Sequence, residues 1–444
     1  MLLEHLPSNQ NIKEVVGIGL GPSNLALAIA VDEQGEDSSN WLFLEKNEEC
    51  MWHPGMLLEG ARLQISFLKD LVTLRNPRSF YSFINYLKEN GRLDEFINLS
   101  HFNPTRIEYV HYLNWVKSHL PQKMMQMGAE VISVNPVANS NSGINLLKTV
   151  YRNRDGEVAS VISKDIVVAV GGTPFIPELF AKSRIKPIFH SCNYLHGIAS
   201  YSSNKPHQFC VVGSGQSAVE IILHLAERFP DSTILSIQRN ATFKPADNSP
   251  FVNEIFFPRN ADFMFDLQNR HNRKRVMDFY HDTNYSAVDI ELLETMYHKM
   301  YNDKWRNKPQ IQLCPFTDIV EVNEQGHKVK LVTRNNLKDE PLSYFEADAV
   351  ILATGYERKT LPAFMDNLLP YFVYDEDELA INRSYQVQTN DEMKARIYLQ
   401  GMSEMTHGIS DTLLSILPIR ANDILQDITN DAAANKEKIK EAVL

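Results

Sequence analysis

Two short glycine-rich stretches decide the fold of this chain: GIGLGP at residues 17–22 and GSGQSA at residues 213–218. Each follows a short, mainly apolar run, at residues 14–16 and 209–212, and each leads into an apolar helical pattern. Strand, glycine-rich turn and helix in this order are typical of a unit that binds a dinucleotide, because glycine lets the backbone approach a pyrophosphate at the helix N-terminus. One such motif alone is also common in ordinary loops. Two copies indicate two dinucleotides.

The charge at the end of the next strand distinguishes the two units. After the first turn, the run WLFLE ends at Glu45. A carboxylate there accepts hydrogen bonds from ribose hydroxyls and repels a 2′-phosphate, which predicts FAD. After the second turn, the run TILSIQR ends at Arg239, whose guanidinium suits a 2′-phosphate and predicts NADPH. Taken singly, either charge could instead be a solvated residue at a strand end.

Length and charge limit the classes of function. The 444 residues suffice for two or three domains, and a net charge of −11 without dense Lys/Arg clusters argues against nucleic acid and anionic membranes as partners. No apolar run is long enough to span a bilayer, and residues 1–7 lack the features of a secretion signal, so we expect a cytoplasmic protein. Cys50, Cys192, Cys210 and Cys314 are too widely spaced for a metal-ligand set or for the redox pair of a disulfide reductase.

Alternating strand and helix signals predict an α/β protein with mainly parallel sheets and two Rossmann-like dinucleotide-binding domains. Two apolar strands that end in glycine, at residues 169–174 and 348–356, mark the crossings between the domains, although such strands are common in any α/β fold. An aromatic- and Asn-rich stretch lies between the second ribose signal and the return crossing. We therefore expect a discontinuous FAD-binding domain (1–175 and 355–444), an NADPH-binding domain (176–247 and 297–354) and an inserted, mainly helical substrate-binding region (248–296).

Further segments carry a resemblance to a known family. They are GIGLGPSNL (17–25), WHPGM (52–56), LQISFLKDL (63–71), YSFINYL (81–87), KPADNSPFVNE (244–254), NYS (284–286), ATGY (353–356) and HGISDTLLS (407–415). With these segments the chain resembles the N-hydroxylating flavin monooxygenases of bacteria and fungi, most closely the L-ornithine N5-monooxygenases of hydroxamate siderophore biosynthesis. The segment at 244–254 favours the ornithine branch over the lysine branch.

The resemblance implies a reaction. NADPH reduces FAD, the reduced flavin takes up O₂ as a C4a-hydroperoxide, and the neutral side-chain amine of L-ornithine attacks it to give N5-hydroxyornithine. NADP⁺ stays bound over the flavin and excludes water. Because relatives form tetramers or dimers, we expect a homo-oligomer.

The resemblance also implies site residues. The FAD contacts are Gly17, Gly19, Gly21, Pro22, Glu45, Lys46, Trp52, His53, Gln64, Val131, His407, Gly408 and Ile409. The NADP contacts are Gly213, Ser214, Gly215, Gln216, Ser217, Arg239 and Asn284. Gln64 and Asn284 are expected beside the reacting centre. His407 is expected to contact FAD through its backbone rather than to act as a base.

Ornithine carries a carboxylate and two amino groups, so a selective pocket needs a cation and neutral acceptors. The resemblance implies that Lys69, Asn253, Asn284 and Ser410 supply them. By spacing alone, Lys69 could be a surface lysine or the ion-pair partner of Asp70, and Asn253 and Ser410 could be turn or cap residues.

Alternative functions stay open at this point. An L-lysine N6-hydroxylase would need the same carboxylate contact, whereas a putrescine or cadaverine N-hydroxylase would offer no carboxylate to Lys69. A non-oxygenating, flavin-binding regulatory protein of the same fold is a further alternative. The intact second glycine turn and Arg239 argue against it, because such a protein would have no use for NADPH.

Overall fold

The computed structural model describes only part of the chain. The described residues are 12–35, 37–139, 143–183, 185–267, 269–358 and 360–443, without the side chains of 139, 284 and 431–443. The expectation about residues 1–7 therefore lies outside the described residues. Asn284 has a described backbone, but its predicted side-chain contacts also lie outside the description.

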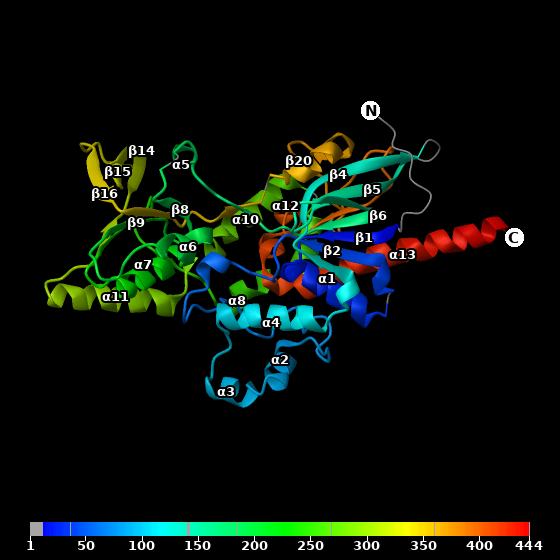
Figure 1. Ribbon diagram of the computed structural model, residues 1–444, viewed down its shortest axis with the longest axis horizontal. Helices are drawn as coiled ribbons and strands as arrows, with labels where there is room; N and C mark the ends of the chain where they lie inside the picture. Colours follow the sequence, from blue (N-terminus) through cyan, green and yellow to red (C-terminus); the bar gives the residue numbers. More distant parts are fainter. Residues whose placement is uncertain are drawn as a thin grey trace.

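The first glycine turn belongs to a seven-stranded sheet with the order β3-β2-β1-β6-β5-β4, in which β21 also pairs with β6 (Figure 1). Its strands are β1 (Lys13–Ile18), β2 (Trp41–Glu45), β3 (Met125–Met127), β4 (Glu130–Asn139), β5 (Gly143–Arg152), β6 (Val158–Val168) and β21 (Ile397–Leu399). β3, β2, β1, β6 and β21 run parallel, and β4 and β5 add an antiparallel meander. The sheet therefore contains strands from both ends of the chain.

The helices of this unit are α1 (Pro22–Glu33), α2 (Phe83–Glu89), α3 (Leu93–Asn98), α4 (Arg106–His119) and α13 (Leu417–Val443). α2 packs against α4 and α3, and Figure 1 shows α2 and α3 beyond α4, away from the sheet. α1 follows the glycine turn and packs against α4 and α13, which explains why every residue from Asn24 to Val31 is buried. A helix whose central residues, Leu25 to Val31, are apolar on every side belongs in the interior rather than on a surface.

The second glycine turn belongs to a parallel five-stranded sheet with the order β13-β10-β9-β17-β8. Its strands are β8 (Ile188–His190), β9 (Gln208–Val212), β10 (Thr233–Ile237), β13 (Ile311–Cys314) and β17 (Ala349–Leu352). The helices of this unit are α5 (Glu178–Ala181), α6 (Tyr194–Ile198), α7 (Gln216–Arg228) and α11 (Ile290–Trp305). A separate antiparallel sheet consists of β14 (Thr317–Gln325), β15 (Lys328–Asn335) and β16 (Ser343–Ala347). The predicted α/β class with two Rossmann-like units is confirmed.

The two crossings between the units lie side by side. β7 (Thr173–Pro174) pairs antiparallel with β18 (Tyr356–Glu357), and the amide of Phe175 donates to the carbonyl of Gly355 at 2.9 Å. The outward and return connections therefore form one short two-stranded link.

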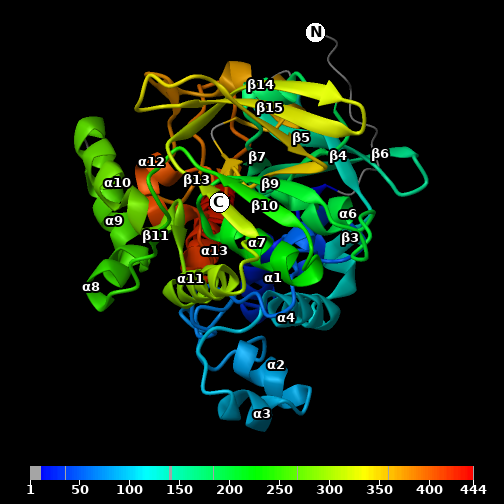
Figure 2. The same ribbon diagram turned by 90° about the vertical axis from the view of Figure 1, so that its left-hand side faces the viewer.

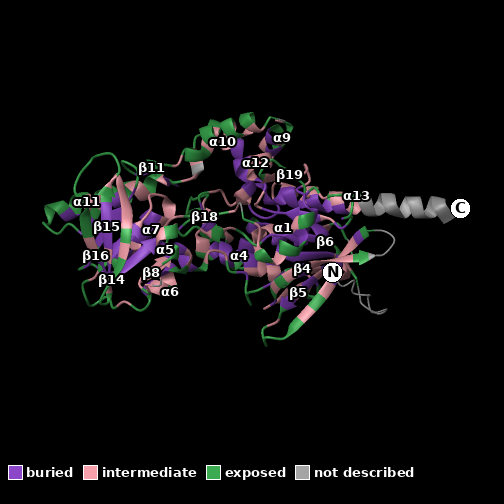
Figure 3. Ribbon diagram, turned by 90° about the horizontal axis from the view of Figure 1, so that it is seen from above, coloured by how far each residue is buried: buried purple, intermediate pink, exposed green. Residues whose placement is uncertain are grey.

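The stretch expected as an insertion is mainly helical. It contains α8 (Pro250–Asn253), α9 (Arg259–Asp266) and α10 (Arg270–Asn284), and a short parallel pair joins β11 (Lys244–Pro245) to β12 (Ala287–Val288). Figures 2 and 3 show these helices along one flank, where α9 and α10 pack against α12 (Glu404–His407). The expected boundary at 296/297 falls inside α11, which packs against α7 of the second unit. The remaining strands, β19 (Tyr374–Asp375) and β20 (Glu378–Leu379), form a hairpin.

Both turns place one glycine against a neighbouring strand. Gly19 has φ +84°, and an added Cβ would lie 2.6 Å from the carbonyl oxygen of Ala169. Gly213 has φ +137°, and its Cβ would lie 2.3 Å from the carbonyl oxygen of Ala353. The helix-capping glycines differ, because a Cβ at Gly21 meets nothing within 4 Å and one at Gly215 meets its nearest atom at 3.5 Å.

We predict that Gly213→Ala and Gly215→Ala affect stability differently. Gly213→Ala should lower the free energy of unfolding by about 2–4 kcal/mol, because it combines an unfavourable φ with a backbone clash. Gly215→Ala is the matched control and should leave stability nearly unchanged. Thermal unfolding followed by circular dichroism measures both, and equal midpoints for the two variants would contradict the geometry.

Candidate functional site

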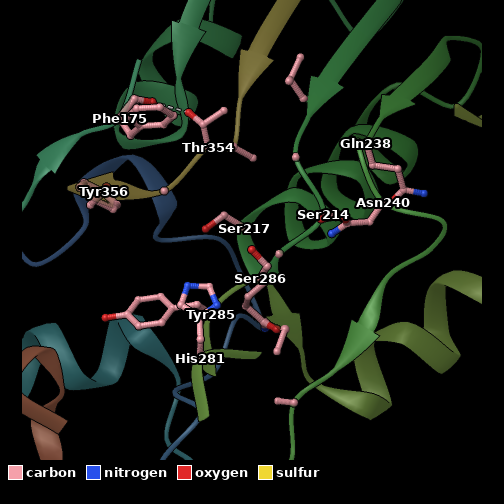
Figure 4. Close-up of a pocket in the computed structure, with 18 of the residues that line it drawn as sticks. Phe175, Ser214, Ser217, Gln238, Asn240, His281, Tyr285, Ser286, Thr354 and Tyr356 are labelled. Carbon is pink, nitrogen blue, oxygen red and sulfur yellow. Dashed lines mark hydrogen bonds between the residues drawn. The ribbon is translucent and has the colours of Figure 1, made fainter. Parts of the chain in front are cut away.

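A cavity of about 1240 Å³ opens between the two units (Figure 4). Its walls come from both glycine-turn units and from the helical stretch at residues 248–288. The predicted site residues that line it are Trp52, His53, Gln64, Lys69, Gly213, Ser214, Gly215, Gln216, Ser217, Arg239 and Asn253. The structure therefore gathers residues that lie up to about two hundred positions apart in the sequence.

One end of the cavity is formed by the second glycine turn. Figure 4 shows Ser214, Ser217 and Asn240 around the open space. Arg239 is exposed at this end, and no carboxylate among the residues that the structure describes forms an ion pair with it. Arg334 also lines this end and lies 3.8 Å from Asp318. This end can hold an anion.

Hydrogen bonds join the two units behind the cavity. The amide of Gln64 donates to Gln216 Oε1 at 3.3 Å, and the Gln216 amide donates to Glu220 Oε1 at 2.8 Å. Glu220, on α7, forms a bidentate ion pair with Arg106 of α4 at 2.6 and 2.7 Å. The first turn of α7 is therefore tied to the first unit.

Lys69 is half-buried and lines the cavity. Its ammonium lies 5.0 Å from the centre of the Phe257 ring, and burial lowers the pKa of its amine. Asp70 is not its partner, because the Asp70 carboxylate accepts from the amides of Val72, Thr73 and Phe83. Lys69 is thus a cation at the cavity with no carboxylate bound to it among the described side chains.

The other predicted substrate residues lie in different settings. Asn253, at the end of α8, lines the cavity and donates to the carbonyl of Asn248 at 3.0 Å, which leaves its amide oxygen available. Ser410 does not line the cavity. Its hydroxyl is buried and has no hydrogen-bond partner among the described residues.

The predicted FAD residues gather at the carboxyl ends of β1 and β2. Glu45 is buried, and its carboxylate accepts from the Leu20 amide of the glycine turn at 2.8 Å and from Asn47. Ala129 donates to the carbonyl of Glu45, and the adjoining strand has a bulge at Val131. Lys46 is exposed on the same edge.

The C-terminal segment is brought to the same place by Arg420, which is 1% exposed. Its guanidinium donates to the Asp411 carboxylate and to the Ser23 hydroxyl at the start of α1, both at 2.9 Å. This contact holds the segment that contains His407, Gly408 and Ile409 against the helix that begins at Gly21 and Pro22.

His407 is buried and neutral. Burial lowers the pKa of its imidazole to about 4. Nε2 lies 3.1 Å from the carbonyl oxygen of Arg383 and must carry the proton, so Nδ1 accepts from the Thr406 hydroxyl at 2.8 Å. With both nitrogens bonded and no place on the cavity wall, the side chain of His407 is structural.

The two turns fit dinucleotides. Gly21 and Gly215 are the N-cap residues of α1 and α7, and neither helix has a side-chain cap. Backbone N–H groups therefore stay available at a positive helix end, with open space beside Gly21. This donor set suits a pyrophosphate in each unit.

Sequence reasoning missed several residues that build this site. Arg106 and Glu220 form a buried ion pair between residues 114 positions apart. Arg420, which is paired with Asp411, also donates to Ser23 from 397 positions away. Contacts over such separations leave no local pattern. Tyr285 lies inside the motif NYS (284–286), but its hydrogen bond to Glu404 joins residues 119 positions apart and could not be predicted from that motif.

The fold and the cavity define a two-dinucleotide α/β protein. The family model described as L-lysine 6-monooxygenase/L-ornithine 5-monooxygenase matches residues 11–358. The chain therefore belongs to this monooxygenase family. None of the described helices is long and apolar enough to cross a membrane.

Similar proteins extend the comparison. An L-ornithine N(5)-monooxygenase of Pseudomonas aeruginosa is 41% identical over 93% of this chain and 93% of its own length. The solved ornithine hydroxylase PvdA of the same species has a TM-score of 0.88 at 40% identity, covering 94% of this chain and 99% of the other. The ornithine N-hydroxylase KtzI of Kutzneria sp. 744, solved with reduced FAD, NADP⁺ and L-ornithine, has a TM-score of 0.89 at 30% identity, covering 95% and 100%.

Proposed function

We propose that this protein is an FAD- and NADPH-dependent monooxygenase that hydroxylates the side-chain amine of L-ornithine for hydroxamate siderophore biosynthesis. The observation that carries the proposal is Lys69, an ammonium on the wall of the shared cavity without a bound carboxylate among the described residues. The ornithine relatives, at up to 41% identity, support the same substrate.

Each unit has a proposed nucleotide. FAD lies along the first unit, with Glu45 at its ribose, the turn at Gly19 at its pyrophosphate and the His407–Ile409 backbone beside it. NADPH lies along the second unit, with Ser214 to Ser217 at its pyrophosphate and Arg239 at its 2′-phosphate. This assignment keeps the domain limits expected from the sequence, except that α11 goes with the NADPH unit because it packs on α7.

The chain's own residues orient the substrate. Lys69 pairs with the α-carboxylate, while Asn253 and Asn284 accept from the α-ammonium. Ser410 stays a predicted substrate residue, although its buried hydroxyl does not line the cavity. Gln64, held by Gln216, lies between the two nucleotides. When bound, FAD reduced by NADPH supplies the activated oxygen, and retained NADP⁺ together with these walls keeps water out.

The proposal includes the setting of the protein. A cytoplasmic location is part of the proposal. α11 exposes Tyr297, Tyr301 and Trp305 at helical spacing, which supports a homo-oligomer.

Arg239→Ala should weaken NADPH binding by about 1.5–3 kcal/mol, because one charge-assisted contact to the 2′-phosphate is lost, and should leave NADH almost unaffected. Stopped-flow kinetics of flavin reduction with both nucleotides measures this. Arg334→Ala, at the same cavity end, is the comparison. The Arg334 guanidinium lies 3.8 Å from the Asp318 carboxylate, so its loss should weaken NADPH binding less than the loss of Arg239. Equal losses for NADPH and NADH in Arg239→Ala would contradict the assignment.

Lys69→Ala should raise the apparent ornithine constant roughly a hundredfold, because loss of a desolvated ion pair costs about 3 kcal/mol. Flavin reduction should persist, so NADPH oxidation yields H₂O₂ instead of product. Lys69→Arg keeps the charge and serves as the control, and putrescine, which lacks the carboxylate, should be insensitive to either change. Normal ornithine hydroxylation by Lys69→Ala, or a wild-type preference for a diamine, would overturn the amino-acid assignment.

A further inference from the structure

An amine must lose a proton before it can act as a nucleophile, because an ammonium has no free electron pair. The side chain of ornithine is an ammonium at neutral pH, since an unperturbed amine of this kind has a pKa near 10. The identity of the group that receives this proton matters only if the proposed hydroxylation is correct. His407 does not serve, because both its ring nitrogens are bonded within the protein.

Tyr285 offers a path from the cavity to a carboxylate. Its ring lines the cavity and stacks on His281 at 5.0 Å. In Figure 4 its hydroxyl points away from Ser217 and Ser286. That hydroxyl donates to Glu404 Oε1 at 2.8 Å and lies 3.1 Å from the hydroxyl of Thr412, which also lines the cavity. The phenol thus connects the cavity to Glu404 on α12.

Glu404 lies behind the cavity wall, in surroundings that increase the proton affinity of its carboxylate. Burial raises the pKa of its carboxyl, the hydrogen bond from Tyr285 lowers it and the charge of Asp411 raises it again. Arg358, on the cavity wall, and His281 of α10 lower it by smaller amounts.

Two further carboxylates on the packed elements are paired with arginines. Asp411 is bound to Arg420, and Asp262, on α9, is bound to Arg383. Glu404 is therefore a carboxylate with increased proton affinity that no basic side chain among the described residues neutralises directly.

We propose that Tyr285 and Glu404 form the route by which the side-chain ammonium of the substrate loses its proton. The ammonium gives one proton to Tyr285 Oη while the Tyr285 hydroxyl gives its own proton to Glu404. The net step converts R–NH₃⁺ and Glu404 carboxylate into R–NH₂ and Glu404 carboxylic acid, so charge and protons balance. Glu404 releases the proton to solvent before the next turnover.

Lys69 and Tyr285 line the same cavity. Lys69 lies over the ring of Phe257, and the adjacent Phe256 belongs to the apolar cluster against which Tyr285 packs. The route requires one bound amino acid to present its carboxylate to Lys69 and its amine to Tyr285.

The test compares Glu404→Gln and Tyr285→Phe with the wild-type holoenzyme. At pH 7.5 each variant should form N5-hydroxyornithine about a hundredfold more slowly, because a positioned proton acceptor typically increases the rate by about this factor. NADPH should still reduce the flavin, and H₂O₂ should replace the missing product. The rate for Glu404→Gln should rise steadily with pH, whereas the wild-type rate reaches a plateau.

A second substrate separates proton transfer from substrate positioning. In 4,4-difluoroornithine the fluorines make the side-chain ammonium more acidic, so both variants should hydroxylate it at close to the wild-type rate. Tyr280→Phe removes a hydroxyl from the same apolar cluster and is the matched control, with wild-type behaviour expected.

Three results would overturn the route. The first is a wild-type pH profile for ornithine hydroxylation in either variant. The second is an equal loss of ornithine and difluoroornithine hydroxylation in both variants, which would mean a purely structural role. If Glu404→Gln fails to fold with FAD, Tyr285→Phe still tests the route, because it keeps the Glu404 carboxylate and removes only the hydroxyl that links it to the cavity. A wild-type protein that forms no N5-hydroxyornithine would contradict the proposed function itself, and the route with it.

Discussion

The ion pair between Arg106 and Glu220 is the contact on which the site depends. Arg106 belongs to α4 of the first unit and Glu220 to α7 of the second, and two hydrogen bonds of 2.6 and 2.7 Å join them. Both side chains are largely buried, so removing one partner would leave an unpaired charge at a cost of about 3–5 kcal/mol. Arg106 also donates to the carbonyl of Met56 at 3.2 Å, which fixes the guanidinium on its own side.

This pair determines how the second glycine turn faces the first unit. Glu220 accepts a hydrogen bond from the side-chain amide of Gln216, and Gln216 Oε1 accepts from the side chain of Gln64 and from the backbone amide of Asp289. The α7 N-terminus, where a pyrophosphate binds, is therefore oriented by a chain of contacts that begins at Arg106. Arg420 has the corresponding role inside the first unit, where it ties the C-terminal segment to the start of α1.

Local patterns predict the parts of this molecule that local forces determine. The glycine turns, the strands before them and Glu45 could be predicted because φ, strand periodicity and position along one βαβ unit suffice. The antiparallel β4–β5 and β14–β16 additions, and the continuation of α11 past residue 296, depend on tertiary packing that short windows do not contain. The role of Lys69 could be predicted only from the surrounding motif, because a lysine next to Asp70 in the sequence suggests an ion pair between the two. The structure shows that the Asp70 carboxylate is used by the backbone instead.

The most direct test of this account is the yield of N5-hydroxyornithine per NADPH oxidised in Glu220→Gln, Arg106→Gln and the double variant. If the ion pair holds the second turn in place, both single variants should oxidise NADPH with a lower product yield and more H₂O₂. The loss of product yield in the double variant should be smaller than the sum of the losses in the two single variants, because the double variant leaves no unpaired charge. A product yield equal to that of the wild type in both single variants would contradict the account.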